Sequence, residues 1–219
     1  MIIVVLLLLG RFCYGQHDEE EGLISTYTLS ELVINAKNLN LDFEYRYANL
    51  YNGYILPQNW FTGDGGRSLI SHPDSAGYQV FLDSIEKHSG RYSLKMELPG
   101  VKTQSNHGLF TGKLPITVVA GKNVEYRGWI KTKDVKDGYA GLWFLVSGDN
   151  KKVLGFNNGK NRGLKGNNEW TQVSIKIKVS KDVTKFTFGG LFNGEGTVWF
   201  DNLEFYIDGK KFVDYEPTL

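Results

Sequence analysis

The sequence has little cysteine, little proline and no excess of charge of either sign. Its 219 residues include one cysteine and five prolines, beside 26 glycines. A single cysteine cannot form a disulfide within the chain, so the stability must come from the core. Abundant glycine with scarce proline indicates many turns and little disorder. Because 25 basic residues are balanced by 24 acidic ones, no bulk field favours nucleic acid or an anionic membrane surface.

Recognisable catalytic motifs are also missing. The four histidines are scattered, and no His-Glu-x-x-His or Gly-x-Ser-x-Gly spacing occurs. Asp83 and Glu86 form an acidic pair of the kind that can flank a glycosidic bond, but 24 acidic residues produce such pairs by chance. The sequence therefore predicts a protein that is not an enzyme, with a small hydrolase as an alternative.

The N-terminal apolar run is too short to cross a bilayer. Ile2 to Leu9 has the length of a signal-peptide core instead, and small residues at Cys13 and Gly15 stand where signal peptidase reads. We expect a signal peptide over residues 1–15 and a secreted product, located in the periplasm, at the cell surface or outside the cell. Residues 16–37 then form a leader, in which Thr28 to Glu31 has capping-box spacing for a short helix, although an extra strand fits as well.

From Leu39 onward the pattern is typical of β-strands. Apolar and polar residues alternate from Val124 to Thr132 and again from Trp170 to Val179, as on strands with one buried face. About ten such segments predict an all-β fold, a two-sheet antiparallel β-sandwich over residues 38–208 with a C-terminal tail at 209–219. The central prediction is that two apolar runs at opposite ends of this domain meet as strands of the sandwich. These runs are Leu39–Tyr45 and Gly196–Tyr206.

Three further stretches carry predictions about local structure. Leu109 to Val119 continues the strand pattern, and Tyr139 to Val146 is nearly all apolar, as a central strand covered on both faces should be. Gly148 to Asn168 is polar and rich in glycine, which predicts a long loop, interrupted by a short strand at Val153 to Phe156.

The order of five short motifs resembles a known family. The motifs are Leu41-Asp42-Phe43-Glu44, His88-Ser89-Gly90-Arg91-Tyr92-Ser93-Leu94, Tyr126-Arg127-Gly128-Trp129-Ile130-Lys131-Thr132, Gly138-Tyr139-Ala140-Gly141-Leu142-Trp143 and Val198-Trp199-Phe200-Asp201-Asn202-Leu203. In this order the chain resembles the carbohydrate-binding-module jelly rolls of the galactose-binding-like superfold. More narrowly, it resembles the N-terminal domain of secreted Bacteroidetes peptidase and erythromycin-esterase-like proteins. The resemblance implies a jelly roll that binds carbohydrate without catalysis, and the sequence ends at Leu219 without the catalytic domain of such relatives.

Asp201 is the first candidate site residue. A carboxylate inside an apolar strand is unfavourable unless it is paired, hydrogen-bonded or bound to a metal. In the modules that this chain resembles, the matching aspartate helps to hold a structural calcium ion with an acidic residue of the first strand, which implies Asp42 or Glu44 here. The alternative is that Asp201 faces solvent at a sheet edge or pairs with a lysine.

Aromatic side chains are the second set of candidates. Trp129 stands on the polar side of its strand beside Arg127, and an exposed indole can stack on a sugar ring while arginine hydrogen-bonds the hydroxyls. Trp143 and Tyr139 could share the same sheet face as Trp129. The alternative is that both tryptophans pack under the segment 148–168 or under the N-terminal segment.

Amide side chains are the third set. Asn157 and Asn158, and the segment Asn49 to Tyr54, offer groups that can hydrogen-bond sugar hydroxyls, but such segments are also ordinary solvated turns. Together these features predict a secreted carbohydrate-binding-like module whose partner is a polysaccharide or another glycan. The alternative is an accessory structural or protein-interaction domain that works with a secreted enzyme.

Overall fold

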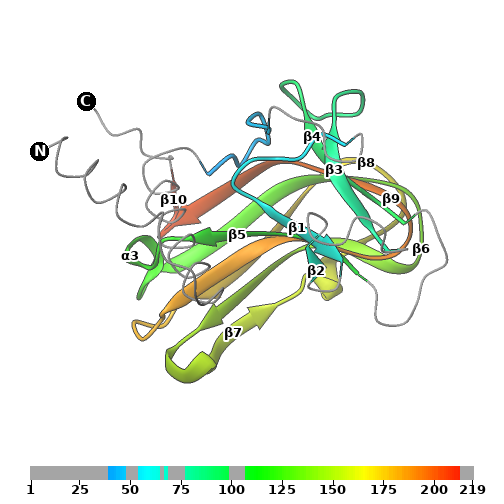
Figure 1. Cartoon of the computed structure of the whole chain (residues 1–219). Coiled ribbons are helices and arrows are strands. Elements are labelled where there is room, and N and C mark those ends of the chain that lie inside the picture. The colour runs from blue at the N-terminus through cyan, green and yellow to red at the C-terminus, as the bar shows by residue number, and fades with distance from the viewer. Residues whose placement is uncertain (1–38, 48–53, 65–66, 69–76, 99–106, 213–219) are drawn as a thin grey trace, which may run out of the picture.

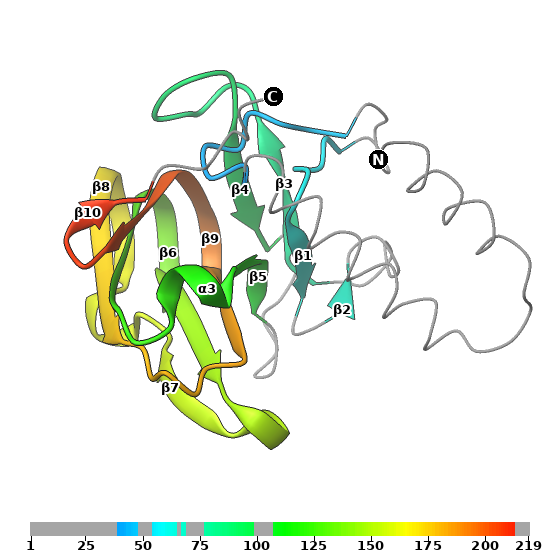
Figure 2. The same cartoon turned by 90° about the vertical axis from the view of Figure 1, so that its left-hand side faces the viewer.

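The protein folds into two facing β-layers. We describe residues 39–47, 54–64, 67–68, 77–98 and 107–212 of a computed structural model. Figure 1 shows one layer in front, with β1, β5 and β7, and Figure 2 shows the two layers side by side from the end that carries α3 and β10. The predicted signal peptide and leader, the segment 48–53 and the end of the predicted tail lie outside the described residues.

Ten strands make up almost all of the regular structure in the described ranges. They are β1 (Phe61–Asp64), β2 (Arg67–Ser68), β3 (Gln79–Asp83), β4 (Ser93–Glu97), β5 (Gly108–Leu114), β6 (Asn123–Ser147), β7 (Val153–Asn157), β8 (Leu164–Lys178), β9 (Lys185–Ile207) and β10 (Lys210–Lys211). The helical elements are α3 (Ile116–Val119) and the 3-10 turns η1 (Asp149–Lys151) and η2 (Lys160–Arg162). None of the described helices is long and apolar enough to span a membrane.

The two longest strands, β6 and β9, belong to both layers. The first half of β6 pairs with the second half of β9, from Val124 opposite Ile207 to Lys133 opposite Thr197. The second half of β6 pairs with the first half of β9, from Tyr139 opposite Asn193 to Ser147 opposite Lys185. Register shifts separate the two paired regions, so each strand bends there and passes from one layer to the other.

Glycine is required where the two strands turn. Gly196 has φ of +107°, and a Cβ there would lie 2.5 Å from the backbone oxygen of Asp134 on β6. Asp134 and Asp137 also have positive φ, at 54° and 51°. Only glycine fits so close an approach at such a φ, because a side chain would meet the opposite backbone.

The pairings define two layers, which we call layer one and layer two. Layer one has the order β2, β1, β5, first half of β9, second half of β6, β7. Layer two has the order β3, β4, second half of β9, first half of β6, β8. All of these pairs are antiparallel, so the predicted jelly-roll β-sandwich is confirmed.

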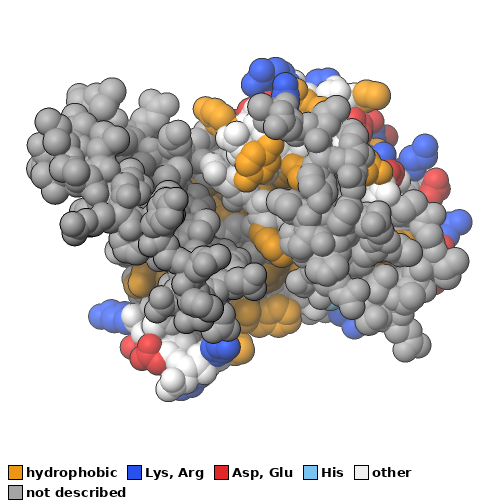
Figure 3. Space-filling model, viewed as in Figure 1, with side chains coloured by type: hydrophobic (Ala, Val, Ile, Leu, Met, Phe, Trp, Pro, Cys, Tyr) orange, Lys and Arg blue, Asp and Glu red, His pale blue; other side chains and the backbone are white. Residues whose placement is uncertain are grey.

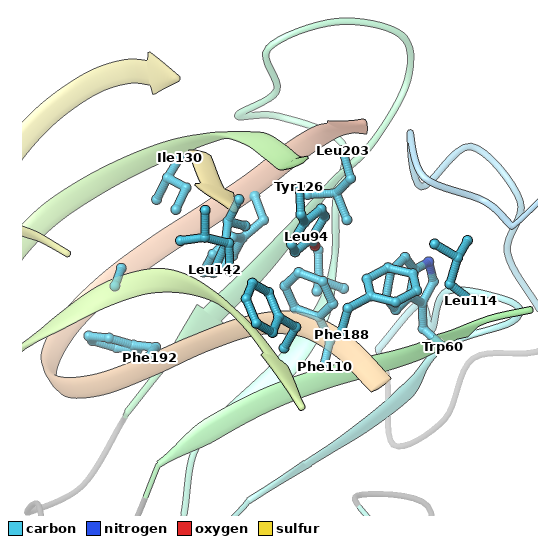
Figure 4. Close-up of a cluster of buried hydrophobic side chains, with 14 of the residues drawn as sticks. Trp60, Leu94, Phe110, Leu114, Tyr126, Ile130, Leu142, Phe188, Phe192 and Leu203 are labelled. Carbon is cyan, nitrogen blue, oxygen red and sulfur yellow. The ribbon is translucent and has the colours of Figure 1, made fainter. Parts of the chain in front are cut away.

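The core fills the space between the layers with aromatic and aliphatic side chains (Figure 4). Phe110 of layer one is fully buried and its ring contacts Phe200 of layer two at 5.1 Å between centroids. Gly128 of layer two also faces inward, since a Cβ there would lie 2.6 Å from Leu203 and 3.3 Å from Leu142 of layer one. The residues that alternate with these on β6 and β9 therefore face outward.

The prediction of a strand at Leu39–Tyr45 was wrong. Asn40 and Phe43 have φ of 59° and 61°, so the segment is a turn, although its apolar and polar residues alternate. The buried Asn40 amide donates to the backbone oxygen of Tyr45 at 2.7 Å and accepts from the Tyr45 N–H at 2.8 Å, which replaces ladder hydrogen bonds. The segment still reaches the last long strand, because Leu203 N–H donates to the Leu41 oxygen at 2.9 Å.

Two other local predictions need correction. The strand expected over Leu109–Val119 ends at Leu114, because Pro115 follows and α3 begins at Ile116. The expected long loop Gly148–Asn168 is shorter, because β8 already begins at Leu164. The short strand expected inside it is present as β7.

Candidate functional site

The outward side chains of layer one form the first candidate surface. On β6 these are Tyr139, Gly141 and the partly exposed Trp143, which alternate with the inward Ala140, Leu142 and Phe144; Tyr139 and Gly141 are themselves buried, although they point outward. On β9 the outward positions Gly189 and Asn193 lie opposite Trp143 and Tyr139 in the ladder. We call this surface, defined by Tyr139, Gly141, Trp143, Gly189 and Asn193, the Trp143 face. In Figure 3, hydrophobic side chains are visible over the middle of this side of the molecule and charged ones along its margins.

Two buried polar atoms on the Trp143 face lack hydrogen-bond partners. Trp143 Nε1, a donor, and Asn193 Oδ1, an acceptor, have almost no exposed surface and no partner; among the described residues Tyr126 Oη, inside the core, is the third such atom. Nε1 lies over Gly189, since a Cβ at Gly189 would come within 3.1 Å of it. A buried group without a partner costs about 1–3 kcal/mol, so each marks a place where water or a ligand can donate or accept.

The segment that follows β7 covers part of the Trp143 face, since a Cβ at Gly141 would lie 3.6 Å from Gly159 Cα. Tyr139 Oη donates to the backbone oxygen of Asn158 at 3.3 Å. A Cβ at Gly163 would lie 2.3 Å from the Tyr139 ring, so the ring packs against this segment. Tyr139 is therefore buried, and burial raises the pKa of its hydroxyl. Asn157 and Asn158 thus lie near Tyr139 and Trp143, as the prediction of one shared site requires.

Trp129 and Arg127 lie on the outer face of layer two, on the opposite side of the sandwich. The prediction that Trp143 and Tyr139 share the sheet face of Trp129 was therefore wrong. The reason is the bend in β6, which places residues 123–133 in layer two and residues 139–147 in layer one. The alternation of apolar and polar residues, when it is extended across the bend of β6, does not predict that the two tryptophans lie on opposite faces, because the strand changes layers there.

Trp129 is partly buried by the connection between β3 and β4. The His88 ring stacks on the indole with centroids 4.1 Å apart and planes 18° apart. Asn202 Nδ2 lies 2.9 Å from His88 Nδ1. Trp129 and Asn202 also line a pocket of about 380 Å³, together with Lys211. His88 therefore occupies one stacking face of Trp129, which leaves less of the indole for a sugar ring.

Arg127 already has partners within the protein. Its Nε and Nη2 donate to the two oxygens of Glu125 at 2.9 and 3.0 Å, and its guanidinium lies 4.0 Å from the Tyr206 ring centroid. The Glu125 carboxylate raises the pKa of Arg127, and Arg127 in turn holds the pKa of Glu125 below its usual range. Binding of a sugar by these donors would have to break the ion pair.

Asp201 is fully buried and surrounded by backbone N–H groups. Its Oδ2 accepts from His88 and Ser89 at 2.9 and 3.0 Å, and its Oδ1 accepts from Asn202 at 2.7 Å. Loss of water around the carboxylate outweighs these hydrogen bonds and raises the pKa of Asp201 to about 6. The side chain therefore fastens the connection between β3 and β4 to β9.

The remaining predicted calcium ligands have partners of the same kind. Glu44 accepts from the Arg91 backbone N–H at 2.7 Å, from Arg91 Nε at 3.0 Å and from the Tyr92 N–H at 3.1 Å. Asp42 accepts from the Glu44 N–H at 3.4 Å. Within the described residues no group of three or more His, Cys, Asp or Glu side chains is placed to hold a metal. N–H donors and a guanidinium do not fit calcium, which takes oxygen ligands, so calcium binding stays a prediction for a titration to test.

The acidic pair Asp83 and Glu86 also serves the fold. Asp83 Oδ2 accepts from Trp199 Nε1 at 2.9 Å, and Glu86 Oε1 accepts from Trp170 Nε1 at 3.2 Å and lies 3.2 Å from Lys131 Nζ. Both carboxylates thus anchor tryptophans on the outer face of layer two. Because both carboxylates already have partners within the protein, the pair does not support the hydrolase alternative.

Asn193 is the candidate residue that the sequence did not predict. It lies in a run of apolar and glycine residues just before Gly194, at the bend of β9. In the sequence alone, an asparagine just before a glycine indicates a turn. Its unpartnered oxygen, and its place on the same face as Trp143, become visible only in the folded chain.

No family model matches the sequence. The chain is similar to the uncharacterized HTH-type transcriptional regulator YbfP of Bacillus subtilis, 27% identical over 135 residues that make up 62% of this chain. The chain covers 45% of that regulator's length.

Two solved structures match most of this chain. The enzymatically active domain of tailspike protein 4 of bacteriophage CBA120 matches 80% of this chain at 11% identity with a TM-score of 0.51, and 21% of that chain is covered. The C-terminal family 22 carbohydrate-binding module of Clostridium thermocellum Xyn10B matches 78% of this chain and 97% of its own, at 10% identity and a TM-score of 0.48. At these identities the likeness to the tailspike domain shows a shared β-sandwich fold and nothing of its activity.

Proposed function

We propose that the protein is a non-catalytic carbohydrate-binding module whose glycan lies on the Trp143 face. The observation that carries this proposal is the pair of unpartnered atoms, Trp143 Nε1 and Asn193 Oδ1, which lie just beneath one outward surface and which a ligand reaches when either side chain rotates. An indole N–H donor and an amide oxygen acceptor complement hydroxyl groups, which donate and accept at once. The indole face supplies the apolar surface that the C–H side of a sugar ring requires.

The layer-one floor suits an extended ligand. Gly189 occupies an outward position beneath the Trp143 indole, while the backbone of Asn158 and Gly159 lies over Gly141 and bounds the floor there. The segment after β7 borders this floor and presents the Asn158 backbone oxygen to Tyr139. A glycan chain resting on Trp143 would therefore meet an amide-rich margin on one side.

The similarity to YbfP supports a recognition role. A match of 135 residues must include much of the sandwich, because the longest stretch outside the described residues is residues 1–38. The part shared with a protein named as a transcriptional regulator is thus at least partly this β-sandwich. A module that binds a ligand fits such a setting without catalysis. Secretion, expected from Ile2–Leu9 and Gly15, is part of our proposal for this chain, as is a role beside a secreted enzyme.

Replacing Trp143 by alanine tests the proposal. After a glycan array has identified a bound polysaccharide, we expect Trp143→Ala to weaken its binding about 20-fold or more, because a central aromatic contact contributes about 2 kcal/mol. Isothermal titration measures the change. Trp129→Ala, on the opposite side of the sandwich, is the matched control and should leave the affinity within about twofold.

Two results would contradict the proposal. Weaker binding in Trp129→Ala with normal binding in Trp143→Ala would place the glycan on layer two. No hit among neutral or charged polysaccharides, together with a specific protein partner in a pull-down, would favour the protein-interaction alternative.

A further inference from the structure

Positive charge is concentrated on one edge of the sandwich. Residues 149–178, which run from η1 through β7 and η2 to the end of β8, contain seven basic residues and two acidic residues, Asp149 and Glu169. The basic residues are Lys151, Lys152, Lys160, Arg162, Lys165, Lys176 and Lys178. Since the whole chain has 25 basic and 24 acidic residues, this edge is a local excess in a balanced protein.

A groove of about 520 Å³ lies along this edge. It is bordered by Asn157, Asn161 and Arg162 on one side and by Ser174, Ile175 and Lys176 of β8 on the other. β7 pairs only with the second half of β6 and β8 only with β6, so each is the edge strand of its layer. The groove therefore follows the open side of the sandwich, where the two layers are not joined by a ladder. None of the residues that line it is acidic.

The polar groups of the groove are mainly donors. Arg162 Nη1 donates to the Ser174 backbone oxygen at 3.4 Å, which holds the guanidinium over β8. Lys176 Nζ lies 3.3 Å from Glu125 Oε2, but this carboxylate also binds Arg127, so one negative charge is shared by two cations. Asn157 Oδ1 accepts the Gly159 N–H at 2.8 Å, which leaves the amide nitrogen of Asn157 as a donor. Such a set attracts an anion that also carries hydroxyl groups.

The segment that borders the groove also contacts the Trp143 face. Asn157 and Asn158 are adjacent in sequence: Asn157 lines the groove, while the Asn158 backbone oxygen accepts from Tyr139. A glycan on the Trp143 face would have to pass over this segment to bring a neighbouring sugar unit to Arg162. This step rests on the proposed function.

We propose that the groove binds the carboxylate of a uronic acid, so that the glycan class is an acidic polysaccharide. A uronate combines one negative charge with several hydroxyls, which matches Arg162 and Lys176 beside two asparagines and a serine. Nucleic acid fits less well, because the net charge of the chain is +1 and no aromatic side chain lines the groove for base stacking.

The test compares ligands that differ only in charge. Polygalacturonate and alginate are titrated against the protein, each beside its fully methyl-esterified form, at low and at high salt. We expect the acidic forms to bind at least 10-fold more tightly than the esters at low salt, with the difference shrinking as salt rises. Arg162→Gln should reduce this preference about fivefold, while Lys87→Gln, which removes an exposed lysine distant in sequence, should leave it unchanged.

The outcomes separate this inference from the proposed function. Equal binding of acid and ester, lost in Trp143→Ala and unaffected by Arg162→Gln, would overturn the uronate groove and leave the Trp143 face in place. A preference for the acidic forms that survives Arg162→Gln would also overturn it. Binding of a single-stranded oligonucleotide as tight as that of polygalacturonate would show a general anion surface and overturn the glycan assignment. A failure of every glycan to bind would overturn both proposals.

Discussion

Phe110→Ala is expected to lower the free energy of unfolding by about 4 kcal/mol, because it leaves a cavity where three parts of the chain meet. The Phe110 ring contacts Trp60 at 5.0 Å, Phe43 at 5.5 Å and Phe200 at 5.1 Å between centroids. Phe43 comes from the N-terminal turn and Phe200 from layer two, so one side chain joins both layers and the first described segment. Urea unfolding followed by tryptophan fluorescence measures the loss.

Phe156→Ala is the matched control, since Phe156 lies on β7 and its side chain is 60% exposed. This variant should change the stability by less than about 0.5 kcal/mol. A loss below about 1 kcal/mol in Phe110→Ala would mean that the N-terminal turn and the two layers do not share one core.

The second large effect concerns Asp201 and pH. Its pKa in the folded protein is about 6, above the usual aspartate value of 3.8, because burial disfavours the charged form. The folded state therefore binds the proton more tightly than the unfolded state between these values. The resulting stabilisation is complete below pH 3.8 and is lost as pH rises through about 6. By linkage it amounts to about 3 kcal/mol.

Other carboxyl groups change the free energy of unfolding with pH in the opposite direction. The pH dependence of the wild type alone therefore does not reveal the contribution of Asp201. Hydrogen bonds and nearby cations lower the pKa of Glu44, Glu125 and Asp208, whose contributions are lost as pH falls. Asp201→Asn isolates the group, because asparagine does not titrate. From pH 7.5 to 4.5, we expect the wild type to gain about 2 kcal/mol relative to the variant in urea unfolding. A pH-independent difference would show that Asp201 keeps an ordinary pKa.

Strands with one buried face could be predicted from sequence. The alternation in Val124–Thr132 and Trp170–Val179 matches the first half of β6 and most of β8, because each presents one face to the core and one to water. The same reasoning failed at Leu39–Tyr45, where a side-chain amide of Asn40 takes over the backbone hydrogen bonds. Alternation records which residues are buried and does not distinguish a strand from such a turn.

The candidate site could be predicted only in part. Trp143, Tyr139, Asn157 and Asn158 are close together, but Trp129 and Arg127 lie across the sandwich, because β6 changes layers between residues 133 and 139. No local residue pattern predicts which layer each half of β6 joins, because the layer depends on how β6 pairs with β9, which is distant in sequence. Asn193 was missed for the same reason, as its partner positions on β6 are more than 50 residues away in sequence.

We propose that Trp143 contacts the ligand, and an NMR titration that follows the indole N–H signals tests this contact directly. The chain has five tryptophans and so five indole N–H signals. Trp60, Trp170 and Trp199 already donate to Asn40, Glu86 and Asp83. When the bound polysaccharide is added, we expect the Trp143 signal to shift most, because the ligand packs against its indole ring. A largest shift at Trp129, with the Trp143 signal unmoved, would contradict the account.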